Sequence, residues 1–217
     1  MDPSTLQDRI SRGLGAAARA TGFFYDAYRP SEPGEPLAPE NRFLRLPALF
    51  NARDPRFGQA SSYGRPCWFG VFDSAYTRPG DYLVGPGGTF FIAAQEHLLP
   101  PLCVLTNATV TVARPAAAGK PGLNGYGGTT HAGARTPLLS GWRASLLAAG
   151  SGGTAILPSD GRPGSWAVLL PPGHCSTSPS DVRTSDVLTD DRNRTFVVAT
   201  VEHTALGHRI TAVQAAA

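Results

Sequence analysis

The chain has 217 residues, 41% of them hydrophobic, and a formal net charge of +3 at neutral pH. This length and apolar content allow one sizeable core or two small ones and exclude a chain that is disordered throughout. No apolar run reaches the roughly 18 residues of a membrane-spanning helix, and the first residues lack the basic and apolar regions of a signal peptide. We therefore expect a chain made and folded in the cytoplasm, with no membrane partner.

The positive charge is distributed along the chain rather than clustered. Arginines carry nearly all of it, with Lys120 as the one lysine, and no basic stripe indicates nucleic-acid binding. An Arg-rich, Lys-poor composition is what a GC-rich genome would produce. The three cysteines (Cys67, Cys103 and Cys175) are widely spaced and lack C-x-x-C spacing, so we expect buried free thiols rather than a disulfide framework or a zinc module.

Residues 1–29 are predicted to form an N-terminal helical arm. Leu6, Ile10 and Leu14 fall on one face of a short amphipathic helix, and Gly22 can end it. Residues 30–40 are rich in proline and predict an extended, stiff linker, which is either a surface crossing or a tether that lets the arm reach a neighbouring subunit. On this interpretation, removal of residues 1 to 30 would leave the β body folded.

The rest of the chain predicts a mainly β fold, an antiparallel β-barrel or sandwich. Twenty prolines and 25 glycines disfavour long helices and favour short strands joined by turns. Short apolar runs separated by turn residues fill residues 41–115, the first β unit, and residues 136–217, the second β unit. Residues 116–135 between them are predicted to be a glycine-rich loop.

Two segments of the chain resemble each other and suggest an internal duplication. Thr89–His97 and Thr195–His203 match in their pattern of aromatic, β-branched and acidic residues. Each follows a short Asp-x-Leu segment, at Asp81–Leu83 and Asp186–Leu188, and each precedes an alternating strand. We therefore expect the two β units to be related.

The motifs of common enzymes are not found. The single lysine, Lys120, is followed by Pro121, which excludes a phosphate-binding P-loop. His174 and Cys175 invite a thiol-hydrolase interpretation, but neighbouring residues on an extended segment point to opposite sides, and a nucleophile and its base must lie within hydrogen-bond reach. We therefore expect no catalytic residue and a protein that is not an enzyme.

A metal site across a predicted hairpin is the remaining chemical candidate. Glu202, His203 and His208 are residue types that bind metals. The pair Glu96–His97 matches Glu202–His203 without any counterpart of His208, which favours a structural role at a strand edge in both copies. We expect neither a metal-binding nor a cofactor-binding residue.

Three segments together resemble virion structural proteins of tailed bacteriophages. They are the aromatic segment Gly22–Pro30, the hairpin from Gly80–Leu83 to Phe91–Ile92, and the segment from Thr184–Asp191 to Glu202–Gly207. The likeness is to proteins of the head–tail neck, of the connector, adaptor or stopper type. Its motifs are hydrophobic patterns that carry no catalytic residue.

This resemblance implies a homo-oligomeric ring at the head–tail junction, which joins portal to tail and surrounds the DNA channel. The expected partners are the portal and other neck or tail proteins, and DNA would pass through the channel without sequence-specific binding. The expected location is the virion, after synthesis in the host cytoplasm. Alternatives are a tail-tip, baseplate or capsid-decorating virion protein, and then a nucleic-acid-binding module or a Cys/His hydrolase.

Overall fold

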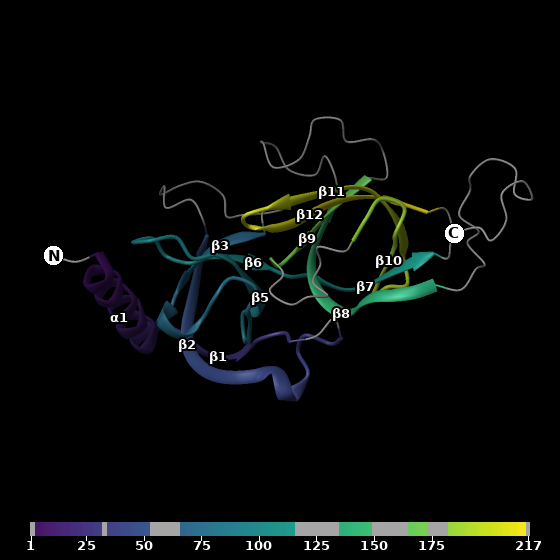
Figure 1. Cartoon of the computed structure of the whole chain (residues 1–217). Helices are drawn as coiled ribbons and strands as arrows, with labels where there is room; N and C mark the ends of the chain where they lie inside the picture. The colour runs from purple at the N-terminus through teal and green to yellow at the C-terminus, as the bar shows by residue number, and fades with distance from the viewer. Residues whose placement is uncertain are drawn as a thin grey trace, which may run out of the picture.

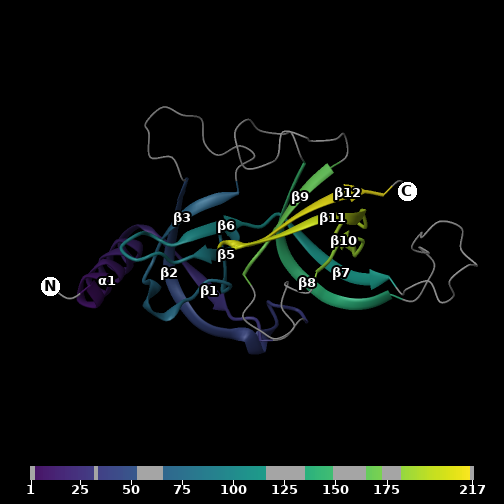
Figure 2. The ribbon, with the colours of Figure 1, turned by 45° about the horizontal axis from the view of Figure 1, so that its top comes forward.

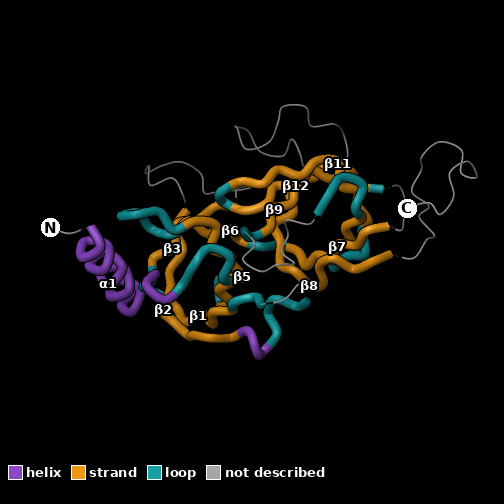
Figure 3. Tube along the Cα trace, in the orientation of Figure 1, coloured by secondary structure: helices purple, strands orange, loops and turns teal. Residues whose placement is uncertain are grey.

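The computed structural model describes residues 3–31, 34–52, 66–115, 135–148, 165–172 and 182–215. This part of the chain holds one α-helix, α1 (Pro3–Thr21), two 3-10 turns, η1 (Pro39–Asn41) and η2 (Ser74–Tyr76), and strands that account for most of the fold (Figure 3). The strands are β1 (Phe23–Tyr28), β2 (Arg42–Ala52), β3 (Cys67–Val71), β4 (Tyr82–Gly85), β5 (Gly88–Ala94), β6 (Leu102–Leu105), β7 (Ala108–Pro115), β8 (Arg135–Ala148), β9 (Ser165–Leu170), β10 (Val187–Asp190), β11 (Thr195–Thr204) and β12 (Gly207–Gln214).

The strands form two closed antiparallel barrels. The first barrel has the order β1-β2-β3-β6-β5-β4, and the second has β7-β8-β9-β12-β11-β10. The order is the same when each barrel is counted from its own first strand, so the prediction of two related β units is confirmed. Figures 1 and 2 show α1, the first barrel and the second barrel following one another along the molecule.

Strand register repeats between the equivalent hairpins of the two barrels. Tyr82 in β4 lies opposite Phe91 in β5, and Val187 in β10 lies opposite Val197 in β11. Bulges recur at equivalent places, between Ile92 and Ala94 in the first barrel and between Val198 and Thr200 in the second. The two segments that matched in sequence, Thr89–His97 and Thr195–His203, therefore begin at the same point of the same hairpin in both barrels.

The first barrel has an aromatic interior. The rings of Phe50 and Phe90 stack with centroids 3.7 Å apart, and Tyr25 meets both rings edge-on. Strand β5 is buried on both faces: Phe90 belongs to the barrel interior, whereas Phe91 belongs to a core shared with the second barrel. The run of consecutive apolar residues in β5 thus reflects a strand that lies between two cores.

Helix α1 packs on its own chain, against β2, β3 and η2. Ala18 is fully buried there, and the hydroxyls of Ser11 and Ser74 lie 3.0 Å apart. Gln7 accepts a hydrogen bond from the backbone N–H of Leu98 at 2.7 Å. The predicted helix is confirmed, and it covers one side of the first barrel.

The boundaries of the predicted arm and of the predicted first β unit differ from those in the structure. Strand β1 falls within the predicted arm of residues 1–29, yet it pairs with β2 and β4 and closes the first barrel. Strand β7 falls within the predicted first unit, 41–115, but belongs to the second barrel. Both differences have the same cause. Each barrel closes because its first strand pairs with its fourth, so β1 and β7 belong to the barrels that they close.

The predicted linker, residues 30–40, is the connection between β1 and β2 rather than a tether between an arm and a body. Asn41 donates hydrogen bonds from Nδ2 to the carbonyl oxygens of Glu35 and Pro36, and Leu37 packs against the shared core. Residues 32–33 lie outside the described part, as do residues 116–134 of the predicted glycine-rich loop; the last residue of that loop, Arg135, begins β8.

Candidate functional site

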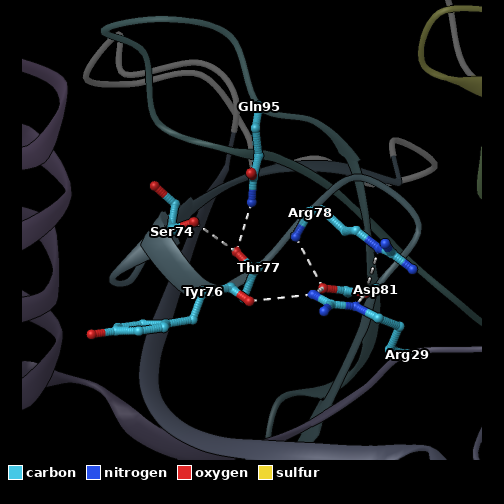
Figure 4. A network of polar contacts seen from close by, with 7 residues as sticks. All are labelled: Arg29, Ser74, Tyr76, Thr77, Arg78, Asp81 and Gln95. Carbon is cyan, nitrogen blue, oxygen red and sulfur yellow. Dashed lines mark hydrogen bonds and ion pairs between the residues drawn. The ribbon is translucent and has the colours of Figure 1, made fainter. Parts of the chain in front are cut away.

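An ion pair with a fully buried carboxylate joins the first and fourth strands of the first barrel (Figure 4). Arg29 follows β1 and donates from Nε to Oδ1 of Asp81 at 2.8 Å and from Nη2 to Oδ2 at 2.7 Å. Asp81 is fully buried and also accepts from the backbone N–H of Arg78 at 2.9 Å. The hydrogen bond with Asp81 raises the pKa of Arg29 above its ordinary value.

The local sequence explains how Asp81 is positioned. The segment Arg78-Pro-Gly-Asp forms a tight turn in which the N–H of Asp81 donates to the carbonyl of Arg78. Gly80 has φ of +94°, a backbone conformation that glycine adopts without strain. The turn directs the carboxylate inward, where a bidentate guanidinium can bind it.

The second barrel contains the same ion pair. Arg114 of β7 donates from Nε and Nη2 to the two carboxylate oxygens of Asp186, each at 3.0 Å, and the N–H of Arg183 donates to Oδ2 at 2.8 Å. Ser185 takes the place of Gly80 and also has positive φ, +74°. We call the two Arg–Asp pairs the strand braces, because each ties the first strand of a barrel to the turn before its fourth.

Sequence reasoning matched Asp81 with Asp186 but missed the two arginines. Arg29 and Arg114 are each followed by proline, but the dipeptide Arg-Pro also occurs at residues 65, 78 and 162, so it did not single them out. The separation along the chain hid the pairing, since it differs between the copies: 52 residues in the first barrel and 72 in the second.

Polar groups continue from the first brace toward α1. Gln95 donates to the hydroxyl of Thr77 at 2.6 Å, and that hydroxyl donates to the carbonyl of Ser74 at 3.3 Å (Figure 4). Beside them lies a polar pocket of about 290 Å³ between α1 and the loop after β5, lined by side chains that include Gln7, Ser11 and His97. These contacts anchor the helix to the barrel.

Among the three residues considered as metal ligands, the structure brings the two histidines together and separates the glutamate. The Nδ1 atoms of His203 and His208 lie 2.8 Å apart across the β11–β12 hairpin, so one nitrogen donates a proton to the other. Glu202 instead forms an ion pair with Arg209 at 3.2 Å. Within the described residues, no group of three or more potential ligands gathers at one point.

His208 is neutral at physiological pH. Burial, and secondarily the neighbouring His203, lower its pKa from 6.5 to about 4. It lines a mostly apolar pocket of about 260 Å³ between the barrels, to which the first barrel contributes Cys67, Phe91 and Leu102 and the second contributes Leu169 and Leu206. Of the described features, the two histidines and this pocket most resemble a catalytic or ligand-binding site.

The other sequence candidates contribute no described site. His174 and Cys175 lie outside the described residues, as does Lys120. Cys103 is a free, buried thiol whose pKa burial raises, which disfavours the reactive thiolate. Cys67 is half-buried and lines the pocket between the barrels.

The histidine pair makes a testable contribution to pH-dependent stability. Because the folded-state pKa of His208 lies below that of an exposed histidine, the folded state binds fewer protons, and stability is lost as pH falls from about 6.5 toward 4. We expect this residue to account for about 2 kcal/mol of lost unfolding free energy between pH 7 and pH 5. Urea unfolding at both pH values measures it.

In the same measurement, the variant His208→Leu should show a smaller loss of stability between pH 7 and pH 5 than the wild type. His97→Leu, which alters an exposed histidine, should keep the wild-type pH dependence. An unchanged loss in His208→Leu would contradict the assignment.

Comparison with known proteins finds no match: no family model, no curated protein and no solved structure is similar to the chain. No helix in the described part of the chain has both the length and the apolar character needed to span a bilayer.

Proposed function

We propose that the chain is a structural protein of a tailed-phage virion, a subunit of the homo-oligomeric ring that joins portal to tail and surrounds the DNA channel. Its partners are further copies of the chain, the portal, and other neck or tail proteins. DNA passes through the ring without sequence-specific recognition. The chain does no chemistry on a substrate in this role.

The observation that carries the proposal is the pair of strand braces on a duplicated barrel. Asp81, Asp186 and Asp190 are the buried carboxylates of the described residues, and each is bound by an arginine of the same chain. We infer that two barrels whose strands are tied in this way form a rigid body, which suits the subunit of a ring. These buried carboxylates therefore hold strands together within each barrel.

The segments that resemble neck proteins coincide with the braced elements. Gly22–Pro30 contains β1 and Arg29, and the hairpin from Gly80 to Ile92 contains Asp81. The third segment, Thr184–Gly207, contains Asp186 and the hairpin of β10 and β11. The resemblance therefore involves the features that define the barrel architecture.

Localisation in the particle tests the proposal. An antibody against the purified chain, visualised with gold on negatively stained virions, should label the region between head and tail. Deletion of the gene should yield separate heads and tails, and plasmid-borne expression should restore joined particles. Label at the tail tip or capsid surface would favour the alternative virion roles, and absence of the chain from purified particles would overturn the proposal.

A further inference from the structure

The interface between the two barrels is formed by one row of side chains on the outer face of the first barrel. Cross-strand partners share a face of a sheet. The register places Tyr28, Tyr82, Phe91, Val104 and Cys67 in one such row across five strands. Three of them are at most 4% exposed and belong to the core shared with the second barrel. We call this row the docking row of the first barrel.

The duplication places an equivalent row on the second barrel. The same register gives Ala113, Val187, Val197, Val213 and Ser165 across β7, β10, β11, β12 and β9. Val213 is 44% exposed, and Val197 and Ala113 are partly exposed, whereas Val187 and Ser165 are buried within the chain. This row consists of small and β-branched residues without a charge, which is the composition of a packed sheet face. We call it the valine row.

The docking row of the first barrel meets a different face of the second barrel. Tyr82 packs edge-on against Trp142 of β8 and donates its hydroxyl proton to the carbonyl of Arg143 at 2.8 Å. The pocket between the barrels is lined by Phe91 of the docking row and by Leu169 of β9. The contact between the barrels is therefore head-to-tail, with unlike faces meeting.

The counterparts of β8 and β9 in the first barrel are β2 and β3, and α1 covers them. The molecule thus ends in α1 on one side and in the region of β7 and β10 on the other (Figure 1). Continuing the head-to-tail contact from one chain to the next brings the valine row of one copy to the α1 side of another.

The outward side of α1 suits such a contact. Gly13, Ala16 and Ala20 are exposed and fall on the side of the helix away from the barrel. Gly13 has open space where a side chain would be. Small residues let a helix approach a sheet of valines closely. Arg9 is exposed on the same side of the helix, one turn before Gly13, so a positive charge bounds the small patch at that end.

We propose that the valine row of the second barrel binds the α1 side of the first barrel in a second copy of this chain. The contact continues between chains the head-to-tail order of the barrels, except that α1 receives the valine row, whereas strand β8 receives the docking row within one chain. A heterologous contact of this kind generates a ring when its rotation closes. The inference deepens the proposed ring function and rests on it.

Complementation between two variants tests this contact. Val213→Arg disables the valine row and keeps α1 intact, whereas Ala16→Arg disables α1 and keeps the valine row. In sedimentation velocity over about 1 µM to 1 mM, the wild type should self-associate and each variant alone should associate at least about tenfold more weakly. An equimolar mixture of the two variants should form dimers, because each supplies the face that the other lacks.

Leu206→Arg is the matched control, since Leu206 is 43% exposed and lies at the tip of the β11–β12 hairpin, outside the valine row. It should associate like the wild type, and circular dichroism with thermal unfolding should show all three variants folded. A wild type that stays monomeric throughout, or variants that fail to complement, would overturn the proposed contact. Gold labelling at the neck would still support the proposed function in that case, so the two failures are distinguishable.

Discussion

Replacing Arg29 or Arg114 by alanine is expected to lower the free energy of unfolding by about 3 to 5 kcal/mol. Each substitution leaves a carboxylate, that of Asp81 or Asp186, buried without its bidentate partner. The loss should be larger for Arg114→Ala. Asp81 retains Arg78 at 3.9 Å, whereas Arg114 is the ion-pair partner of Asp186 in the described part of the chain. Urea unfolding followed by tryptophan fluorescence measures both values.

Arg42→Ala is the control for this comparison. Arg42 is bound to Asp26 at 2.7 Å, but the arginine side chain is 46% exposed and its partner 32%. An exposed ion pair of this kind contributes at most about 1 kcal/mol.

The double variant Arg29→Ala with Asp81→Ala should recover part of the stability lost in Arg29→Ala, because it removes the buried charge as well. If Arg29→Ala and Arg114→Ala lost no more unfolding free energy than Arg42→Ala, the interpretation of the strand braces as buried ion pairs that stabilise the barrels would be contradicted.

Deletion of residues 1 to 30 is expected to abolish cooperative folding of the first barrel. The deletion removes β1, which pairs with both β2 and β4, together with Tyr25 of the interior and Arg29 of the brace. Two strands would then have unpaired edges, and an open sheet of this kind tends to associate with other chains. Near-ultraviolet circular dichroism should show loss of fixed aromatic packing.

Deletion of residues 1 to 20 is the matched comparison. It removes nearly all of α1 but retains Gly22 and β1, so the barrel can still close. The variant should fold with a stability lower by about 2 kcal/mol, from the apolar surface that the helix no longer covers. If the deletion to residue 30 folded as well as the shorter one, β1 would not be required for the barrel.

Local sequence patterns were sufficient to predict the elements of the fold. Short apolar runs between turn residues predicted strands in residues 41–115 and 136–217, and strands are present in both ranges because period and turn chemistry depend on neighbouring residues. The matched segments after Asp81 and Asp186 likewise predicted the duplication, since repeats keep the pattern of buried residues.

Features of the site that join distant residues were predicted only in part. His203 and His208 were considered together because a hairpin connects them, and the structure places them in contact. Glu202 was assigned to the same group, but it turns to Arg209 on the neighbouring strand. Side chains that alternate along a strand share a face only with every second residue, so Glu202 and His203 point apart.

The sequence by itself determined the β class, the amphipathic helix and the repeat, because these depend on residue type and on short-range spacing. Only the tertiary structure decided that β1 closes the first barrel and that β7 opens the second, since closure pairs strands far apart in the chain. It also decided that Arg29 meets Asp81 across 52 residues and Arg114 meets Asp186 across 72. Barrel closure brings these charges together in a buried environment, and no pattern of neighbouring residues encodes that distance.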